Sequence, residues 1–265
     1  MGMTGLVLVW AAVSLGATPE EFTHDFRSQA LPPTLRLVGP EAERYVRLES
    51  QGLRVSLPAD RKDLVAPVGL ATVFGMRGNF EITAAYEVLK AEEPDTGFGV
   101  GVNLRVKEVE PSPEAAMVAW LVRAKGQQVA AWDWSKVGPG GKLKPEGKAV
   151  PSTARVGRLR LQRVGDALRF LIASDTSGET FQELHQCDFG RDDLERAYLT
   201  VLTSRAPRAV EVRWLELQIR ADGLPGLTPS TGGPSMAWLV GGWSAIVLLV
   251  GGGWLVWRRT RKARK

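Results

Sequence analysis

The most regular pattern of hydrophobic and polar positions in the chain runs over residues 80–88. Apolar side chains occupy every second position, and Glu81, Thr83 and Glu87 lie between them. The apolar positions are Phe80, Ile82, Ala84, Tyr86 and Val88. A period of two places the two sets on opposite faces of a strand, as a sheet with one face on a core and the other in water requires. The pattern predicts a half-buried antiparallel strand.

The same pattern returns after a turn signal at residues 93–97. A second core face is formed by Phe98, Val100, Val102, Leu104 and Val106. The positions opposite them are Gly97, Gly99, Gly101 and Asn103. Because these residues are small, they leave their face of the strand flat and open to a neighbouring strand or a ligand.

A β-hairpin around Gly165 and Asp166 can be tested by its register. The pairs implied by a two-residue turn are Val164 with Ala167, Leu161 with Phe170, Leu159 with Ile172 and Gln162 with Arg169. This single register separates apolar from polar side chains on both strands, which supports the hairpin. Further strands are expected at 115–123, 129–134, 181–188, 197–204 and 210–220, with shorter ones among residues 22–74. A break in alternation at Trp214-Leu215 indicates a bulge or burial on both sides.

Residues 20–221 are therefore expected to form one all-β domain, a two-sheet antiparallel sandwich. No helical period of 3.6 extends over three turns within it. Residues 136–151 are rich in Gly, Lys and Pro and predict a mobile loop, either a flap over a binding face or a solvated connector. Residues 222–235 are rich in Gly, Pro, Ser and Thr and predict a flexible stalk.

Apolar runs flank this domain on both sides. Residues 5–17 are too few to cross a bilayer comfortably and end in small residues, so residues 1–17 predict a cleaved secretory signal peptide. No Lys or Arg precedes the run, so an uncleaved anchor or a misplaced start codon is the alternative. Residues 236–257 carry no charge over 22 positions. At about 1.5 Å per residue they would cross the ~30 Å core of a bilayer as one transmembrane helix.

A basic tail at residues 258–265 sets the expected orientation of this helix. Lys and Arg next to a membrane span stay on the cytoplasmic side, so the tail is expected inside and the β-domain outside the cytoplasm. The residues that carry this signal are Arg258, Arg259, Arg261 and Lys262. The sequence thus predicts a single-pass membrane protein with the lipid bilayer as a partner. Removal of the C-terminal segment during surface anchoring is the alternative.

Small residues recur every four positions in the predicted helix, at Ala237, Gly241 and Ala245. Such a stripe lets two transmembrane helices approach closely, so a homodimer through it is one interpretation. The other interpretation is that these are ordinary small residues facing lipid.

The net charge of +5 changes meaning once its location is considered. Six of the 34 basic side chains lie in the tail, which leaves 28 against 29 acidic side chains in the rest of the chain. The exported domain is therefore almost neutral, and nucleic acid is not expected as a partner.

Few residues suit metal binding or nucleophilic catalysis. Cys187 is the single cysteine and His24 and His185 are the only histidines, so an intramolecular disulfide and the common zinc sites cannot be assembled. His185 and Cys187 share a strand face, but no third ligand accompanies them. No G-x-S-x-G motif is present. The sequence predicts no cofactor and no metal.

The candidate ligand-binding residues are Trp120, Trp132 and Trp134. On a strand, Trp132 and Trp134 project to one face and Asp133 to the other. With Trp120 on the preceding strand, they would form an aromatic platform on which sugar rings stack. The competing interpretation is that the indoles fill the space between the two sheets. It is favoured because aromatic residues are common core filling and no polar partner group is evident.

Three segments resemble a known family: GNFEITAAYEVLKAEEPDTGFGVGVNL, VGLATVF and GRLRLQRVGDALRFLIASD. They are similar to a bacterial exported-domain family of unknown function that is grouped with the concanavalin-A-like lectin and glucanase sandwiches. The resemblance covers about residues 22–220. It implies a jelly roll of two curved antiparallel sheets and no established activity.

Glucanases of this superfamily carry their acid and nucleophile as Glu-x-Asp-x-Glu on one strand, because retaining hydrolysis needs two carboxyl groups about 5 Å apart. The present sequence has no such motif. We therefore expect a non-enzymatic, membrane-anchored binding module for a glycan or an envelope protein. A structural or scaffolding role in the cell envelope is the alternative, and a glycosidase is a distant third.

Overall fold

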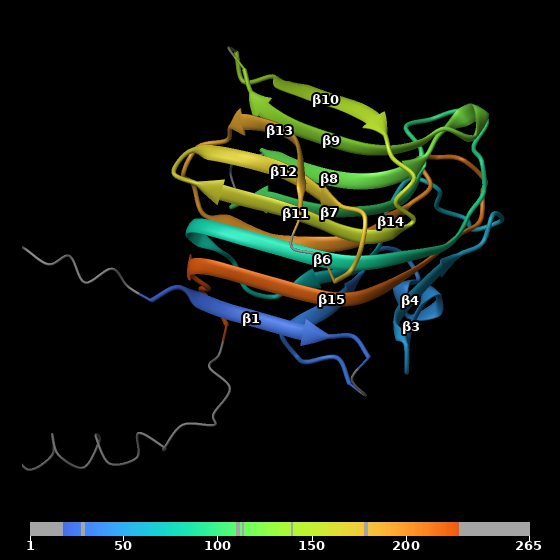
Figure 1. Ribbon diagram of the computed structural model, residues 1–265, viewed down its shortest axis with the longest axis horizontal. Helices are drawn as coiled ribbons and strands as arrows, with labels where there is room; N and C mark the ends of the chain where they lie inside the picture. The colour runs from blue at the N-terminus through green and yellow to red at the C-terminus, as the bar shows by residue number, and fades with distance from the viewer. Residues whose placement is uncertain are drawn as a thin grey trace, which may run out of the picture. The chain divides into compact units, whose positions relative to one another are not determined.

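Strands make up nearly all of the regular structure, as the alternating pattern predicts, and they form two antiparallel sheets (Figure 1). The computed structural model describes residues 18–27, 30–109, 112, 114–138, 140–177 and 180–227. Helical structure among these residues is limited to the four-residue α1 (Ala42–Tyr45) and the 3-10 turn η1 (Ala124–Gly126). The all-β, two-sheet prediction is confirmed.

The first sheet has eight strands, in the order β13-β12-β11-β6-β15-β4-β3, and β1 also pairs with β15. Its strands are β1 (Glu20–Asp25), β3 (Val46–Glu49), β4 (Gly52–Leu57), β6 (Arg77–Ala91), β11 (Val156–Val164), β12 (Ala167–Ala173), β13 (Gln182–Asp188) and β15 (Val210–Gly223). The long strands β6 and β15 lie side by side at its centre, as Figure 1 shows.

The second sheet has seven strands, in the order β10-β9-β8-β7-β14-β5-β2. Its strands are β2 (Leu35–Val38), β5 (Val68–Thr72), β7 (Val100–Glu108), β8 (Ala115–Val122), β9 (Gln128–Val137), β10 (Leu143–Pro151) and β14 (Leu194–Leu202). We call its solvent-directed face the outer face of the seven-stranded sheet.

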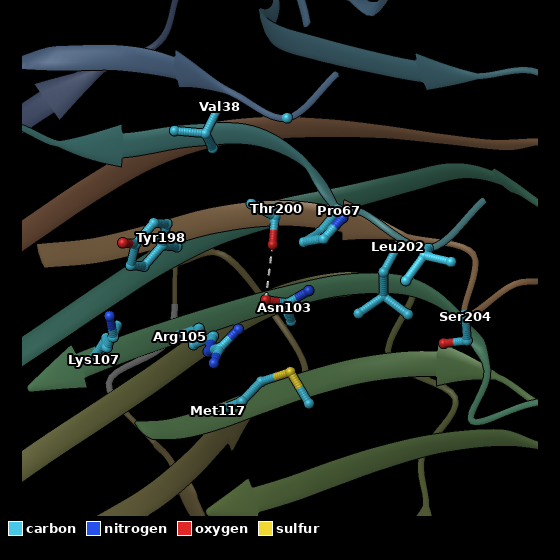
Figure 2. Close-up of a pocket in the computed structure, with 12 residues that line it drawn as sticks. Val38, Pro67, Asn103, Arg105, Lys107, Met117, Tyr198, Thr200, Leu202 and Ser204 are labelled. Atoms are coloured by element: carbon cyan, nitrogen blue, oxygen red, sulfur yellow. Dashed lines mark hydrogen bonds between the residues drawn. The ribbon is translucent and has the colours of Figure 1, made fainter. Parts of the chain in front are cut away.

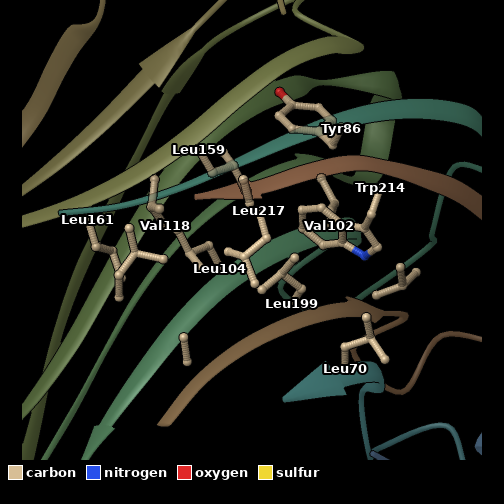
Figure 3. Close-up of a cluster of buried hydrophobic side chains, with 14 of the residues drawn as sticks. Leu70, Tyr86, Val102, Leu104, Val118, Leu159, Leu161, Leu199, Trp214 and Leu217 are labelled. Atoms are coloured by element: carbon tan, nitrogen blue, oxygen red, sulfur yellow. The ribbon is translucent and has the colours of Figure 1, made fainter. Parts of the chain in front are cut away.

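The core lies between the two sheets and is built from the predicted apolar positions. All five apolar side chains of residues 80–88 are buried, as are Val100, Val102, Leu104 and Val106. Figure 3 shows leucines and valines from strands of both sheets in the core, together with Tyr86 and Trp214. The hydroxyl of Tyr86 donates to the Ala154 carbonyl oxygen at 2.8 Å, so the buried phenol is satisfied.

Several local predictions are confirmed in detail. The hairpin of β11 and β12 has each of the four expected pairs, from Val164–Ala167 to Leu159–Ile172. The register of β15 against β6 shifts between Trp214 and Glu216, which is the predicted bulge.

Two expectations are wrong. Phe98 is partly exposed and precedes β7 instead of forming its core face. Residues 136–151 do not form a mobile loop, because Leu143–Pro151 is the edge strand β10, paired with β9. The lysines and prolines that suggested a loop suit an edge strand, where one row of backbone groups faces solvent.

The remaining predictions concern residues outside those that the structure describes. They are the signal peptide at 1–17, residues 228–235 of the stalk, the helix at 236–257 with Ala237, Gly241 and Ala245, and the basic tail. The first part of the predicted stalk, residues 222–227, instead continues the domain, since Gly223 ends β15 and Leu224 is 2% exposed. Within the described residues, no helix has the length and apolar character needed to cross a membrane.

Candidate functional site

The candidate platform residues Trp120 and Trp132 lie in the core between the sheets. Their side chains are 0% and 8% exposed. The indole nitrogen of Trp120 donates to the Ser152 carbonyl oxygen at 3.2 Å, and the ring of Trp132 stacks on His185 with centroids 3.7 Å apart. The interpretation of these two residues as a solvent-facing platform is therefore wrong, and the favoured alternative of core filling describes them.

Trp134 points to the same side of β9 and is half-buried against the edge of the core. Cys187 on β13 is also half-buried, and burial raises the pKa of its thiol to about 12. A protonated thiol is a poor nucleophile and a poor metal ligand. No cluster of three metal-binding side chains occurs among the described residues.

With the tryptophans turned inward, Asp133 turns outward, as the alternation predicted, and it belongs to a row of side chains across the outer face of the seven-stranded sheet. Cross-strand pairing places Tyr198, Arg105, Met117 and Asp133 next to one another on β14, β7, β8 and β9. We call these four residues the polar row. At about 4.8 Å per strand, the row is roughly 14 Å long.

The neighbouring row on the same face consists of small side chains. Its members on the same four strands are Thr200, Asn103, Ala119 and Ala131. Gly69 continues it on β5, where an added Cβ would lie 2.1 Å from the carbonyl oxygen of Leu199. Ala119 and Ala131 are fully buried in a small apolar cluster, whereas Asn103 and Thr200 lie at a hollow in the surface.

This hollow is a pocket of about 390 Å³, which we call the outer pocket (Figure 2). A volume of this size is within the range of small-molecule sites. It is lined by Val38, Gly39, Val65, Pro67, Asn103, Arg105, Lys107, Met117, Tyr198, Thr200, Leu202 and Ser204. The walls are largely apolar, and the polar groups gather on β7 and β14.

A buried polar pair lies at the floor of the outer pocket. Asn103 and Thr200 are 2% and 3% exposed, and the Thr200 hydroxyl donates to Oδ1 of Asn103 at 2.9 Å. Because Oδ1 is engaged by this bond, the amide nitrogen of Asn103 lies on the other side of the side chain, as Figure 2 shows. The pair thus presents a hydrogen-bond donor whose orientation is fixed by a partner.

Two cationic side chains line the outer pocket above this pair. The exposed guanidinium of Arg105 makes no hydrogen bond or ion pair with a described residue. The ammonium of Lys107 lies 3.8 Å from the Glu195 carboxylate, a long and weakly held pair. Burial raises the pKa of the Tyr198 phenol, so it is a neutral hydroxyl at physiological pH.

Asp133 lines a second pocket, of about 220 Å³, that shares Arg105 and Met117 with the outer pocket. Burial raises the pKa of the Asp133 carboxyl, and the positive charge of Arg105 partly opposes this change. In the polar row, Met117 lies between Arg105 and Asp133, so the backbones of Arg105 and Asp133 are about 10 Å apart by strand spacing. The two charges therefore do not form a close pair.

Sequence reasoning marked the Asn103 face as open but did not identify Arg105, Tyr198 or Thr200 as site residues. The signal was present in the alternation of residues 100–108, which puts Asn103, Arg105 and Lys107 on the face opposite the valines. The partners on β14 could not be found from the sequence, because their pairing with β7 joins segments about 100 residues apart.

The two-sheet sandwich has the concanavalin-A-like jelly-roll fold, a known structural class of lectins and glucanases. Residues 10–237 match the family model described as the C domain of a protein of unknown function, DUF1583. The chain therefore belongs to this family. A comparison with curated protein sequences finds no match.

Solved structures with the same fold include several carbohydrate-active proteins. A family 16 endo-glucanase from Bacteroides ovatus matches with a TM-score of 0.53 and 10% identity, over 75% of this chain and 99% of that one. A Crh5 transglycosylase in complex with NAG matches with a TM-score of 0.52 and 14% identity, over 78% and 86%. A pseudo β-1,3-glucanase of Mycobacterium tuberculosis matches with a TM-score of 0.52 and 8% identity, over 76% and 98%. At these identities the comparisons establish the fold alone.

Proposed function

We propose that this protein is a non-enzymatic carbohydrate-binding module and that the outer pocket is its binding site. The observation that carries the proposal is the buried Asn103–Thr200 pair at the floor of a pocket of about 390 Å³. Polar residues on the outer face of a sheet normally stay in contact with water, and burying them has a cost unless they are hydrogen-bonded. Here the pair is retained and aims a donor at the pocket.

The chemistry of the walls suits a saccharide. Val38, Leu202 and Met117 supply apolar surface, and the Tyr198 ring is the aromatic group among the lining residues. A sugar ring has an apolar face and a rim of hydroxyl groups, so it needs such a surface together with a few oriented polar groups.

The carboxyl groups support binding over hydrolysis. None of the residues that line the outer pocket is acidic, and the neighbouring pocket offers the single carboxyl group of Asp133. Retaining hydrolysis uses two carboxyl groups about 5 Å apart, and inverting hydrolysis also uses a pair.

We further propose that the module is exported and anchored in a membrane by residues 236–257, with the basic tail in the cytoplasm. The support is the uncharged run of 22 residues followed by six basic side chains. Protease added to intact cells is expected to degrade the domain and spare a tag placed after Lys265. Protection of the domain in intact cells would contradict this topology.

The binding proposal is tested with the full-length chain in detergent on an array of neutral and acidic oligosaccharides. At least one saccharide is expected to bind, and Met117→Trp, which fills the outer pocket from β8, is expected to remove that binding. Thr23→Trp, on the outer face of the eight-stranded sheet, is the matched control. Absence of any binding, or equal loss in both variants, would refute the proposal.

A further inference from the structure

We infer that the outer pocket selects acidic saccharides and holds the carboxylate of a uronic acid residue between Arg105 and the Asn103 amide. This inference rests on the proposed carbohydrate binding. It names the chemical class of the ligand, which neither the fold nor the family assigns.

The first argument is the charge balance of the outer pocket. Its described lining contains two cations, Arg105 and Lys107, and no anion. The oriented group at the floor, the Asn103 amide nitrogen, is also a donor. A neutral saccharide offers hydroxyl groups that both donate and accept, whereas a carboxylate accepts at both oxygens. A site dominated by donors and positive charge is therefore complementary to the carboxylate.

The second argument is a contrast between the two outer faces of the sandwich. On the eight-stranded sheet, the arginines of the central strands are paired with carboxylates on neighbouring strands. These pairs are Arg54–Glu211 at 2.6 Å, Arg213–Glu87 at 2.6 Å and Arg160–Glu81 at 3.2 Å. On the seven-stranded sheet, the neighbours of Arg105 across the strands are Tyr198 and Met117, which are uncharged.

The guanidinium of Arg105 thus remains open on a face that the pocket makes accessible. A planar guanidinium can hold a carboxylate through two parallel hydrogen bonds, which a lysine cannot reproduce. Arg105 and Asn103 are two positions apart on β7, so both side chains point to the same face about 7 Å apart along the strand. A carboxylate placed between them can accept from both.

The third argument concerns Asp133. Its carboxyl group lies at the far end of the polar row, where it would repel a carboxylate near Arg105 from the side of β9. The ligand carboxylate is therefore placed between Arg105 and Asn103 and toward Tyr198 on β14, away from β9. The Asp133 carboxylate thus weakens the binding of acidic ligands by repulsion. Replacing it with Asn should strengthen the binding of acidic ligands and leave the binding of neutral ligands unchanged.

The experiment measures binding of three probes to the full-length chain in detergent by calorimetry: a galacturonic acid trimer, its methyl ester and sodium acetate. The acid is expected to bind at least tenfold more tightly than the ester, and acetate is not expected to compete at the same concentration. Arg105→Gln should abolish the preference for the acid, and Asp133→Asn should increase it severalfold. Arg169→Gln, an exposed arginine of β12, is the control and should change nothing.

Each outcome has a separate meaning. Equal binding of acid and ester would overturn the inference and leave the carbohydrate proposal standing. Competition by acetate at the same concentration would overturn the saccharide part, because a simple carboxylate would then suffice. If neither trimer binds while saccharides of the array do, the assignment of acidic saccharides as the ligand class is wrong. If no saccharide binds, both this inference and the proposed carbohydrate binding are wrong. Thermal melting of the Arg105→Gln variant verifies its fold, and an unchanged acid preference in a folded variant would also overturn the inference.

Discussion

Replacing Trp132 with Ala tests whether this indole belongs to the core. The side chain is 8% exposed and stacks on His185 with an interplanar angle of 8°. Truncating a buried Trp costs about 3 to 5 kcal/mol, and the stacked contact accounts for about 1 kcal/mol of such a loss. For a domain of this size, each kcal/mol lowers the Tm by about 2 to 4 °C, so the variant should melt roughly 6 to 20 °C below the wild type.

Urea unfolding followed by far-UV circular dichroism measures this loss without relying on tryptophan fluorescence. Trp134→Ala is the matched control, since its side chain is only half-buried and its loss should be about 1 to 2 kcal/mol. A Trp132→Ala variant within 1 kcal/mol of the wild type, with saccharide binding lost, would refute the core assignment and restore the aromatic platform.

Three further changes test other parts of the structure. Gly69→Ala should lower the free energy of unfolding in urea by about 1 to 3 kcal/mol, because the new Cβ would lie 2.1 Å from a backbone oxygen. Gly223→Ala is the control and should cost little, because the nearest atom to its Cβ would be 3.7 Å away. Equal costs would contradict the close approach of the strands at Gly69. Arg163→Met should lower the free energy of unfolding by about 3 kcal/mol or more, because the guanidinium of this 1% exposed residue donates to the carbonyl oxygens of Gly78 and Asp192. Arg169→Met on the surface is the control and should cost under about 1 kcal/mol. A similarly small loss in the Arg163 variant would contradict the assigned hydrogen bonds. Burial raises the folded-state pKa of Asp133, so the folded state binds this proton more tightly, and stability falls as pH rises through the folded pKa. Asp133→Asn should therefore be more stable than the wild type at pH 7 and equal to it near about pH 3, where the carboxyl is protonated in both states; a variant destabilised at pH 7 would contradict the direction of the pKa change.

The parts of the fold that could be predicted from the sequence are those in which one face of a strand is clearly polar. Residues 80–88 and the hairpin of β11 and β12 have this property, so their registers and buried faces were correct. The strand β8, Ala115–Val122, is apolar on both faces and buried along nearly its whole length. Its alternation shows which side chains share a face with Trp120, but it cannot show which face meets the other sheet.

The edge strand β10 was missed for a different reason. Pro145, Gly147 and the two lysines of β10 oppose strand propensity, and the strand exists because β9 supplies hydrogen bonds along one side. Pairing of this kind is a tertiary effect that local composition does not contain. The same limit applies to the outer pocket, whose halves on β7 and β14 come together only through sheet register.

The polar character of the proposed binding site is related to the use of tryptophans in the core. With Cys187 as the single cysteine, the sandwich has no intramolecular disulfide, so its stability must come from burial. Its largest side chains are therefore used between the sheets, where Trp120 and Trp214 are fully buried. The outer face of the seven-stranded sheet is left with small residues and the polar row, and the outer pocket is lined by members of both rows. The proposed site would discriminate ligands by charge and hydrogen bonding more than by stacking. For this reason the comparison of an acid with its methyl ester is a sharper test than a survey of neutral sugars.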